Sequence, residues 1–125
     1  MIIELTEPAQ NDLESIKNYI KKDSLYYANI FIQKIFISIE KLEAFPRIGR
    51  IVPEYKIENI REIIYKDYRI IYKIDDTKNI IYIVAIIHGS RDLENNIKNM
   101  DFSQQNYLLT ILPNYLHLIC NLPHF

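Results

Sequence analysis

The chain has 125 residues, a length typical of one domain, and its 49% hydrophobic and 25% charged residues indicate a globular protein. With 15 basic and 16 acidic residues the net charge is -1, which argues against a polycationic protein that coats nucleic acid. One cysteine excludes an intrachain disulfide framework and fits a reducing cytosol, and two glycines exclude the usual Gly-rich phosphate-binding loops. Because Glu4 and Glu7 interrupt the apolar start and no run nears about 18 apolar residues, we expect neither a signal peptide nor a membrane span.

The first 45 residues predict a strand followed by two helices. Residues 2–5 suit a short strand, and Thr6 and Ser24 each precede a run with apolar residues at helical spacing, where they are expected to cap a helix. The first helix is expected over 8–22, and the second covers about 20 residues until Pro46 ends it. Because the link between them is short, the two helices should form an antiparallel hairpin.

The residues that follow predict a loop and three strands. Residues 46–53 contain two prolines and a glycine, which is typical of a loop. Runs rich in β-branched residues occupy 60–65, 68–74 and 79–87, and the last does not alternate with polar residues, as in a central strand that is apolar on both faces. We therefore expect an α+β fold, in which an N-terminal strand and a helical hairpin pack on a small, mainly antiparallel sheet. The hairpin should cover one face of the sheet and leave the other free for a partner or substrate.

The expected turn at Lys66 and Asp67 sets the register of the first two strands of this meander. A two-residue turn places Ile64 opposite Arg69 and Arg61 opposite Tyr72, so the two arginines point to opposite faces of the sheet. Both arginines therefore serve one site only if a bulge shifts the register. Glu62 shares a face with Arg69 and Lys73 and could pair with either, and a structural ion pair is the alternative to a functional role for Arg69.

The end of the chain differs in composition from the rest. Beyond about residue 95, Lys98 and Asp101 are the only charged residues, and apolar clusters occupy 107–112 and 115–120. We divide the chain into a domain over residues 1–93 and an atypical C-terminal extension over 94–125. Three interpretations of the extension stay open: helices that cover an apolar surface, a segment that binds a partner or another copy, and a tail outside the ancestral reading frame.

Basic residues and tyrosines are interleaved in the middle of the chain. Between residues 46 and 73 there are seven Lys or Arg residues and four Asp or Glu residues, a combination with tyrosine that suits phosphate contact and base stacking. Solvated basic side chains and packed tyrosines explain the same pattern. No metal-ligand spacing and no Gly-x-Ser-x-Gly or Cys–His nucleophile arrangement occurs. Glu54 as a general base, arginines as phosphate clamps and His88 as a general acid would suffice to cleave RNA through its own 2′-hydroxyl, but a structural His88 fits equally well.

Four segments together resemble a known family of bacterial toxins. The chain contains Phe-Pro-Arg-Ile-Gly-Arg-Ile-Val-Pro-Glu, then Ile-Arg-Glu, then Tyr-Arg-Ile-Ile-Tyr, and finally Ile-His-Gly-Ser-Arg-Asp-Leu. In this order and spacing they resemble the RelE/ParE toxins of type II toxin–antitoxin modules over about residues 1–93. The resemblance implies a small α+β toxin of the cytoplasm that a cognate antitoxin wraps and neutralises.

The family includes two activities, and the resemblance leans toward one of them. The Gly49-Arg50 loop and the ending from His88 to Asp92 look more like ParE toxins, which bind and inhibit DNA gyrase. The alternative is a RelE-like endoribonuclease that cleaves mRNA on the ribosome. An inactive relative that only binds an antitoxin is a third hypothesis.

The resemblance also implies candidate site residues and partners. If the protein is a nuclease, the catalytic residues are Glu54, Arg69 and His88, which fall at places comparable to the Glu, Arg and late His of some RNA-cleaving relatives. Arg50, Arg61 and Arg91 are the candidates for binding nucleic acid or another target. The expected partners are an antitoxin and either gyrase or the ribosome with mRNA, and a homodimer is left open. No metal, other cofactor or membrane is expected.

Overall fold

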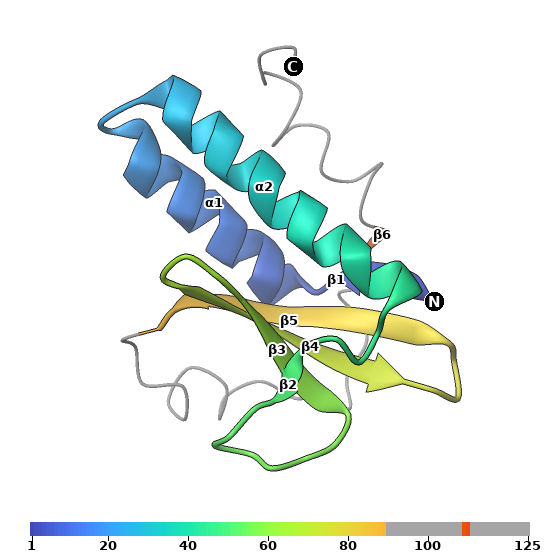
Figure 1. The fold of residues 1–125 in the computed structure, drawn as a ribbon. Helices are drawn as coiled ribbons and strands as arrows, with labels where there is room; N and C mark the ends of the chain where they lie inside the picture. The colour runs from blue at the N-terminus through green and yellow to red at the C-terminus, as the bar shows by residue number, and fades with distance from the viewer. Residues whose placement is uncertain (90–108, 111–125) are drawn as a thin grey trace.

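The computed structural model of the protein describes residues 1–89 and 109–110. Two helices, α1 (Glu7–Lys21) and α2 (Leu25–Ala44), lie side by side across one face of a sheet (Figure 1). The sheet has the strand order β2-β3-β4-β5-β1-β6. Its strands are β1 (Ile2–Leu5), β2 (Arg50–Ile51), β3 (Ile60–Tyr65), β4 (Tyr68–Asp75), β5 (Ile80–His88) and β6 (Leu109–Thr110). The expected α+β fold, with a strand and a helical hairpin ahead of the meander, is confirmed.

Most of the sheet is antiparallel. Among the described strands, β1 and β5 form the one parallel pair, and the other pairs are antiparallel. Strands β3, β4 and β5 form the expected meander. The crossover from β1 to β5 leaves β5 between β4 and β1, so the prediction of a central strand is confirmed. The prediction of a plain loop over 46–53 was wrong in one detail, since Arg50–Ile51 pairs with Arg61 and Glu62 of β3. A two-residue strand is too short to carry an alternating pattern.

Both helices begin at the predicted caps. The Thr6 hydroxyl accepts a hydrogen bond from the Ala9 amide at 3.4 Å, and the Ser24 hydroxyl accepts one from the Tyr27 amide at 3.1 Å. These bonds satisfy amide groups that the first turn of a helix leaves without a partner. The Thr6 hydroxyl also donates to the Ile83 carbonyl at 2.9 Å, which ties the start of α1 to β5.

The main core lies between the helices and the sheet. The apolar stripes of α1 and α2 pack against one face of β4 and β5, and fully buried members include Leu13, Ile32, Ile35, Ile39, Leu42, Ile70, Ile74 and Ile81. Among the described residues, no helix is both long enough and apolar enough to cross a membrane.

The opposite face of the sheet is buried over part of its extent, so the expectation of a wholly free face was wrong. It carries a second buried cluster of Val52, Ile60, Ile71, Tyr82, Val84, Ala85 and Ile87. The register of β4 and β5 shifts between Ile71 and Tyr72, which pair with Ala85 and Ile83, so that Val84 is the extra residue of a bulge. Because β5 is apolar on both sides, both faces have to be buried, and the segment after β2 contributes Val52 to the second one.

Candidate functional site

An open pocket of about 590 Å³ lies at the end of the sheet where β3 turns into β4 and β5 ends. Four of the sequence candidates line this pocket, namely Arg50, Glu54, Arg69 and His88. Arg69 lies two residues before Ile71 of the second cluster on β4, and therefore on the face of the sheet opposite the helices. The pocket thus collects side chains from β2 and the loop after it, and from the ends of β3, β4 and β5.

Arg69 is the centre of an ion-pair network in this pocket. Its Nη1 and Nη2 atoms donate to the two carboxylate oxygens of Glu54 at 2.8 and 2.9 Å. Its Nε donates to Glu62 Oε1 at 2.6 Å, and the Nε of Arg50 donates to Glu62 Oε2 at 2.6 Å. The ion pair with Glu62 that the strand register suggested for Arg69 is therefore present, and Glu54 adds a second, two-pronged pair.

The network runs from the interior to the solvent. The side chains of Glu62 and Arg69 are 0% and 11% exposed, whereas those of Glu54 and Arg50 are 31% and 61% exposed. A buried carboxylate is costly unless charged groups pair with it, and Glu62 has two such partners. Glu54, in contrast, meets Arg69 from the solvent side of the pocket.

Each charged group of the Glu54–Arg69 pair stabilises the ionised form of the other. The hydrogen bonds from the Arg69 guanidinium lower the pKa of Glu54, and in turn the bonds to Glu54, followed by those to Glu62, raise the pKa of Arg69 further above its ordinary value. Glu54 is thus a carboxylate of reduced basicity. A general base works best with a pKa near the operating pH, so this environment does not suit Glu54 to that role.

His88 and Tyr68 form the aromatic part of the pocket wall. The two residues are opposite each other in the β4–β5 ladder, and their rings meet edge to face with centroids 5.4 Å apart. Tyr68 in turn packs edge to face against Phe31 of α2 at 5.5 Å. These contacts connect the pocket to the helical layer at the ends of β4 and β5.

Arg61 does not join the pocket. The register confirms that Arg61 lies opposite Tyr72 and Arg69 opposite Ile64, so the two arginines are on different faces of the sheet. The Nη1 of Arg61 donates to the Gly49 carbonyl at 2.9 Å, its Nη2 donates to Glu58 Oε1 at 2.8 Å, and its Nε donates to the Glu58 carbonyl at 3.0 Å. Arg61 therefore holds the chain that carries Arg50. Arg91 lies outside the described residues.

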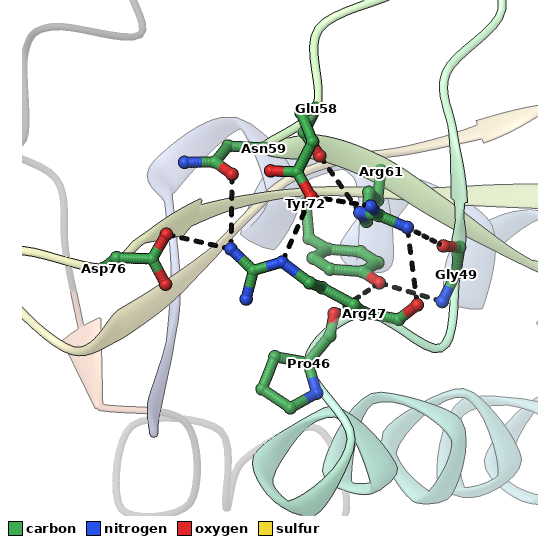
Figure 2. A network of polar contacts seen from close by, with 8 residues as sticks. All are labelled: Pro46, Arg47, Gly49, Glu58, Asn59, Arg61, Tyr72 and Asp76. Atoms are coloured by element: carbon green, nitrogen blue, oxygen red, sulfur yellow. Dashed lines mark hydrogen bonds and ion pairs between the residues drawn. The ribbon is translucent and has the colours of Figure 1, made fainter.

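Tyr72 and Gly49 complete this attachment of the loop to the sheet, as Figure 2 shows. The Tyr72 hydroxyl donates to the Pro46 carbonyl at 2.7 Å and accepts from the Gly49 amide at 3.1 Å, and its burial raises its pKa. A Cβ at Gly49 would lie 2.5 Å from the Glu62 carbonyl oxygen and 2.6 Å from the Tyr72 hydroxyl. Only glycine fits this approach without displacement.

Arg47 fastens the same segment from outside (Figure 2), through bonds to Glu58 at 3.1 Å and to Asp76 at 2.9 Å. The sequence analysis did not identify Tyr72 or Gly49 as residues that shape the site. One signal was present, since a glycine between Ile48 and Arg50 in a proline-flanked loop indicates either an unusual backbone angle or a close approach.

Within residues 1–89 and 109–110, no group of three or more His, Cys, Asp and Glu residues is placed to hold a metal ion. The pocket offers the charged side chains of Arg50, Glu54 and Arg69 and the rings of Tyr68 and His88.

Comparison with known proteins gives a family for residues 3–93. These residues match the family model described as the ParE toxin of the type II toxin–antitoxin system parDE. No curated protein matches the chain.

Two solved structures have a similar fold. The chromosomal ParDE toxin–antitoxin system from P. aeruginosa aligns with a TM-score of 0.59 and 19% identity, over 70% of this chain and 95% of that one. A doubly substituted E. coli toxin RelE in complex with an antitoxin RelBc peptide aligns with a TM-score of 0.53 and 11% identity, over 81% of this chain and 95% of that one.

Proposed function

Because the chain belongs to the ParE toxin family of type II toxin–antitoxin systems, we propose that it arrests growth by binding and inhibiting DNA gyrase. The family match covers the segments whose Gly49-Arg50 loop and His88-Gly89 ending resemble ParE more than RelE. We further propose that residues 1–93 form the toxin domain, that residues 94–125 are an extension to it, and that the protein acts in the cytoplasm.

The observation that carries this proposal is the two-pronged ion pair between Arg69 and Glu54. A nuclease would need Arg69 to donate to a scissile phosphate and Glu54 to accept a proton, yet both Nη atoms already donate to Glu54. The lowered pKa of Glu54 also reduces its strength as a base. The resting pocket is therefore built for binding and is poorly arranged for acid–base chemistry.

An antitoxin is the proposed partner under normal growth. The two similar structures are described as a ParDE system and as a RelE toxin in complex with a RelBc peptide, and this chain aligns with 95% of each matched chain. A partner that buries the pocket or the loop beside it would neutralise the protein by occupying the same surface as the target.

Arg50 is the residue that we propose contacts the target. Its side chain is 61% exposed although its Nε is bonded to Glu62, so the side chain is held at one atom and is otherwise accessible. Arg61 is a weaker candidate, because it is mostly buried and bonded to Gly49 and Glu58. Arg91 stays a proposal from the resemblance.

One observation favours the alternative, a ribosome-dependent mRNA endoribonuclease. Glu54, Arg69 and His88 line the same pocket, as a general base, a phosphate ligand and a general acid would have to. Under this hypothesis His88→Gln should lower cleavage by about 10²–10⁴-fold. Under the gyrase hypothesis the same substitution should leave inhibition largely intact.

The two functions are separated by two assays on the same purified full-length preparation. One measures supercoiling of relaxed plasmid by gyrase, and the other measures cleavage of mRNA on programmed ribosomes. We expect inhibition of supercoiling, no cleavage, and weaker inhibition by Arg50→Ala. The matched control is Lys78→Ala, which removes an exposed cation from the β4–β5 turn at the other end of the sheet. Cleavage that His88→Gln abolishes, with supercoiling unaffected, would replace the proposal with the alternative.

A further inference from the structure

We propose that the outer edge of β1 is a strand-binding site, and that a segment of the same chain, residues 109–112, fills it and closes the sheet. The outer edge is the side of β1 that faces away from β5. The segment lies beyond residues 3–93, which match the toxin family, so the inference concerns a part of this chain that the family match does not cover. It goes beyond the proposed function, because it involves neither the pocket nor the target.

The hydrogen bonds of β1 show which of its backbone groups face the outer edge. The Ile2 amide donates to the Asn79 carbonyl at 3.1 Å, and the Thr6 amide donates to a carbonyl of β5 at 3.0 Å. Because the backbone groups of successive residues in a strand point to opposite sides, the amides and carbonyls of Ile3 and Leu5 face away from β5. The outer edge of β1 therefore offers two donors and two acceptors to a further strand.

Water has little access to these edge groups. Leu5 is 0% exposed and Ile3 is 5% exposed, and buried backbone N–H and C=O groups are nearly always hydrogen-bonded. For Leu5 the partner is described, since it pairs with Leu109 of β6, which lies beside β1 (Figure 1). The backbone of Ile3 requires a partner two positions further along the same strand.

The register of β6 identifies that partner in the sequence. β6 runs antiparallel to β1 and places Thr110 opposite Glu4. The next pair in this register is Ile111 opposite Ile3, so the backbone of Ile111 would supply the partner that Ile3 requires. Pro113 comes opposite the residue before β1, and because proline has no N–H to donate, the pairing would stop where β1 begins. The segment 109–112 thus matches β1 in length.

A segment of the same chain has an advantage over a strand from another molecule. Residues 89–108 connect β5 to β6, and β1 is the one strand between them. Two strand spacings are ~10 Å, and an extended chain covers about 3.3 Å per residue, so the connection is long enough to reach the edge. Such a tether gives the segment an effective concentration of the order of millimolar. Because an open sheet edge is a template for strand addition, the segment would keep second copies of the chain from pairing there.

The first test is disulfide formation in two variants of the full-length chain, both with Cys120→Ser so that the native cysteine takes no part. Glu4→Cys with Thr110→Cys joins directly opposite residues of the pair that is not hydrogen-bonded, where the Cα atoms are about 4.5 Å apart and a disulfide fits. The matched control is Ile2→Cys with Thr110→Cys, a diagonal pair about 7–8 Å apart, which is too far for an undistorted disulfide.

Air oxidation is followed by mass spectrometry and non-reducing gel electrophoresis. We expect the opposite pair to form a disulfide within one chain at least about 10-fold faster than the diagonal pair. Equal rates for the two pairs, or no disulfide in either, would overturn the proposal. A disulfide-linked dimer would also overturn it, because a second copy would then occupy the edge.

The second test uses two proline variants and the exchange of the Leu5 amide with deuterated water, measured by NMR. Leu109→Pro removes the N–H that faces β1, whereas Thr110→Pro removes one that faces away and is the matched control. Leu109→Pro should speed exchange at Leu5 at least about 10-fold relative to Glu4, whose amide faces β5, and Thr110→Pro should not. A Leu5 amide that is unprotected in the wild-type protein, or equal effects of the two prolines, would contradict the proposal. Neither test involves gyrase or an antitoxin, so failure here and failure of the proposed function are distinguishable.

Discussion

Replacing Arg69 with leucine should destabilise the protein far more than the loss of a surface ion pair, because it leaves the buried Glu62 carboxylate short of a partner. Breaking a buried pair by removal of one member costs about 3–5 kcal/mol, whereas an exposed pair contributes about 0–1 kcal/mol. Glu62 keeps its 2.6 Å bond from Arg50, and a charged hydrogen bond contributes about 1.5 kcal/mol or more. We therefore expect Arg69→Leu to lower the free energy of unfolding by about 2–3 kcal/mol.

Two further variants make this expectation specific to Glu62. The double variant Glu62→Leu, Arg69→Leu removes both buried charges and should recover to within about 1 kcal/mol of wild type, since Glu54 and Arg50 reach solvent without them. Arg50→Ala should have little effect alone and a larger effect in the Arg69→Leu background, because Glu62 then has no arginine left.

The measurement is urea unfolding of the full-length chain at pH 7, followed by far-ultraviolet circular dichroism. If the urea midpoint shifts while the dependence of the unfolding free energy on urea keeps its slope, the substitution has changed stability and has left the compactness of the folded and unfolded states unchanged. The reasoning is refuted if Arg69→Leu costs under about 1 kcal/mol, or if the double variant is no more stable than the single one.

Three other substitutions test the attachment of the loop and the charge of the pocket. Gly49→Ala should lower the free energy of unfolding by about 1–3 kcal/mol, because the new Cβ would lie 2.5 Å from the Glu62 carbonyl oxygen. Gly89→Ala is the control and should change stability little, since its Cβ would have its nearest contact at 3.4 Å. Equal effects of the two substitutions in urea unfolding would contradict this. Tyr72→Phe removes the partner of the Gly49 amide and the Pro46 carbonyl and should cost about 1–3 kcal/mol by calorimetry, and an unchanged melting temperature would count against the attachment. Arg69 lowers the pKa of Glu54 in the folded protein. The Glu54–Arg69 pair therefore contributes fully to stability above pH 4.5, the ordinary pKa of the carboxyl group, and this contribution is lost as the pH falls through the pKa of Glu54 in the folded state. Glu54→Gln should therefore lose stability less steeply than wild type below pH 4.5, and parallel acid limbs would show that the pair is not formed.

The elements that follow local rules could be predicted from the sequence. Thr6 and Ser24 are caps because their side chains reach amides three residues away, and no distant contact is needed. The two-residue turn at Lys66 and Asp67 sets the pairing of Ile64 with Arg69, since side chains alternate along both strands. The same register placed Glu62 beside Arg69, and the ion pair between them followed.

The features that depend on distant contacts could not be predicted. The loop that carries Arg50 is shaped by the Tyr72 hydroxyl and by Arg61, which come from strands later in the chain, so the spacing of residues did not indicate how this loop is attached to the sheet. The sequence does not indicate the bulge at Val84, because no residue of β5 before His88 is charged or strongly polar and no alternation marks where the register shifts. Glu54 lies 15 residues from Arg69, and only the folded loop turns its carboxylate onto the guanidinium.

The central claim is that the protein stops growth through gyrase, and it is tested most directly by pulse labelling of growing bacteria within minutes of induction of the full-length chain. Labelled thymidine reports DNA synthesis and labelled methionine reports protein synthesis in the same culture, with an uninduced culture as the reference. We expect thymidine incorporation to fall first, while methionine incorporation continues. A fall in methionine incorporation ahead of thymidine, or no fall in either, would contradict the claim.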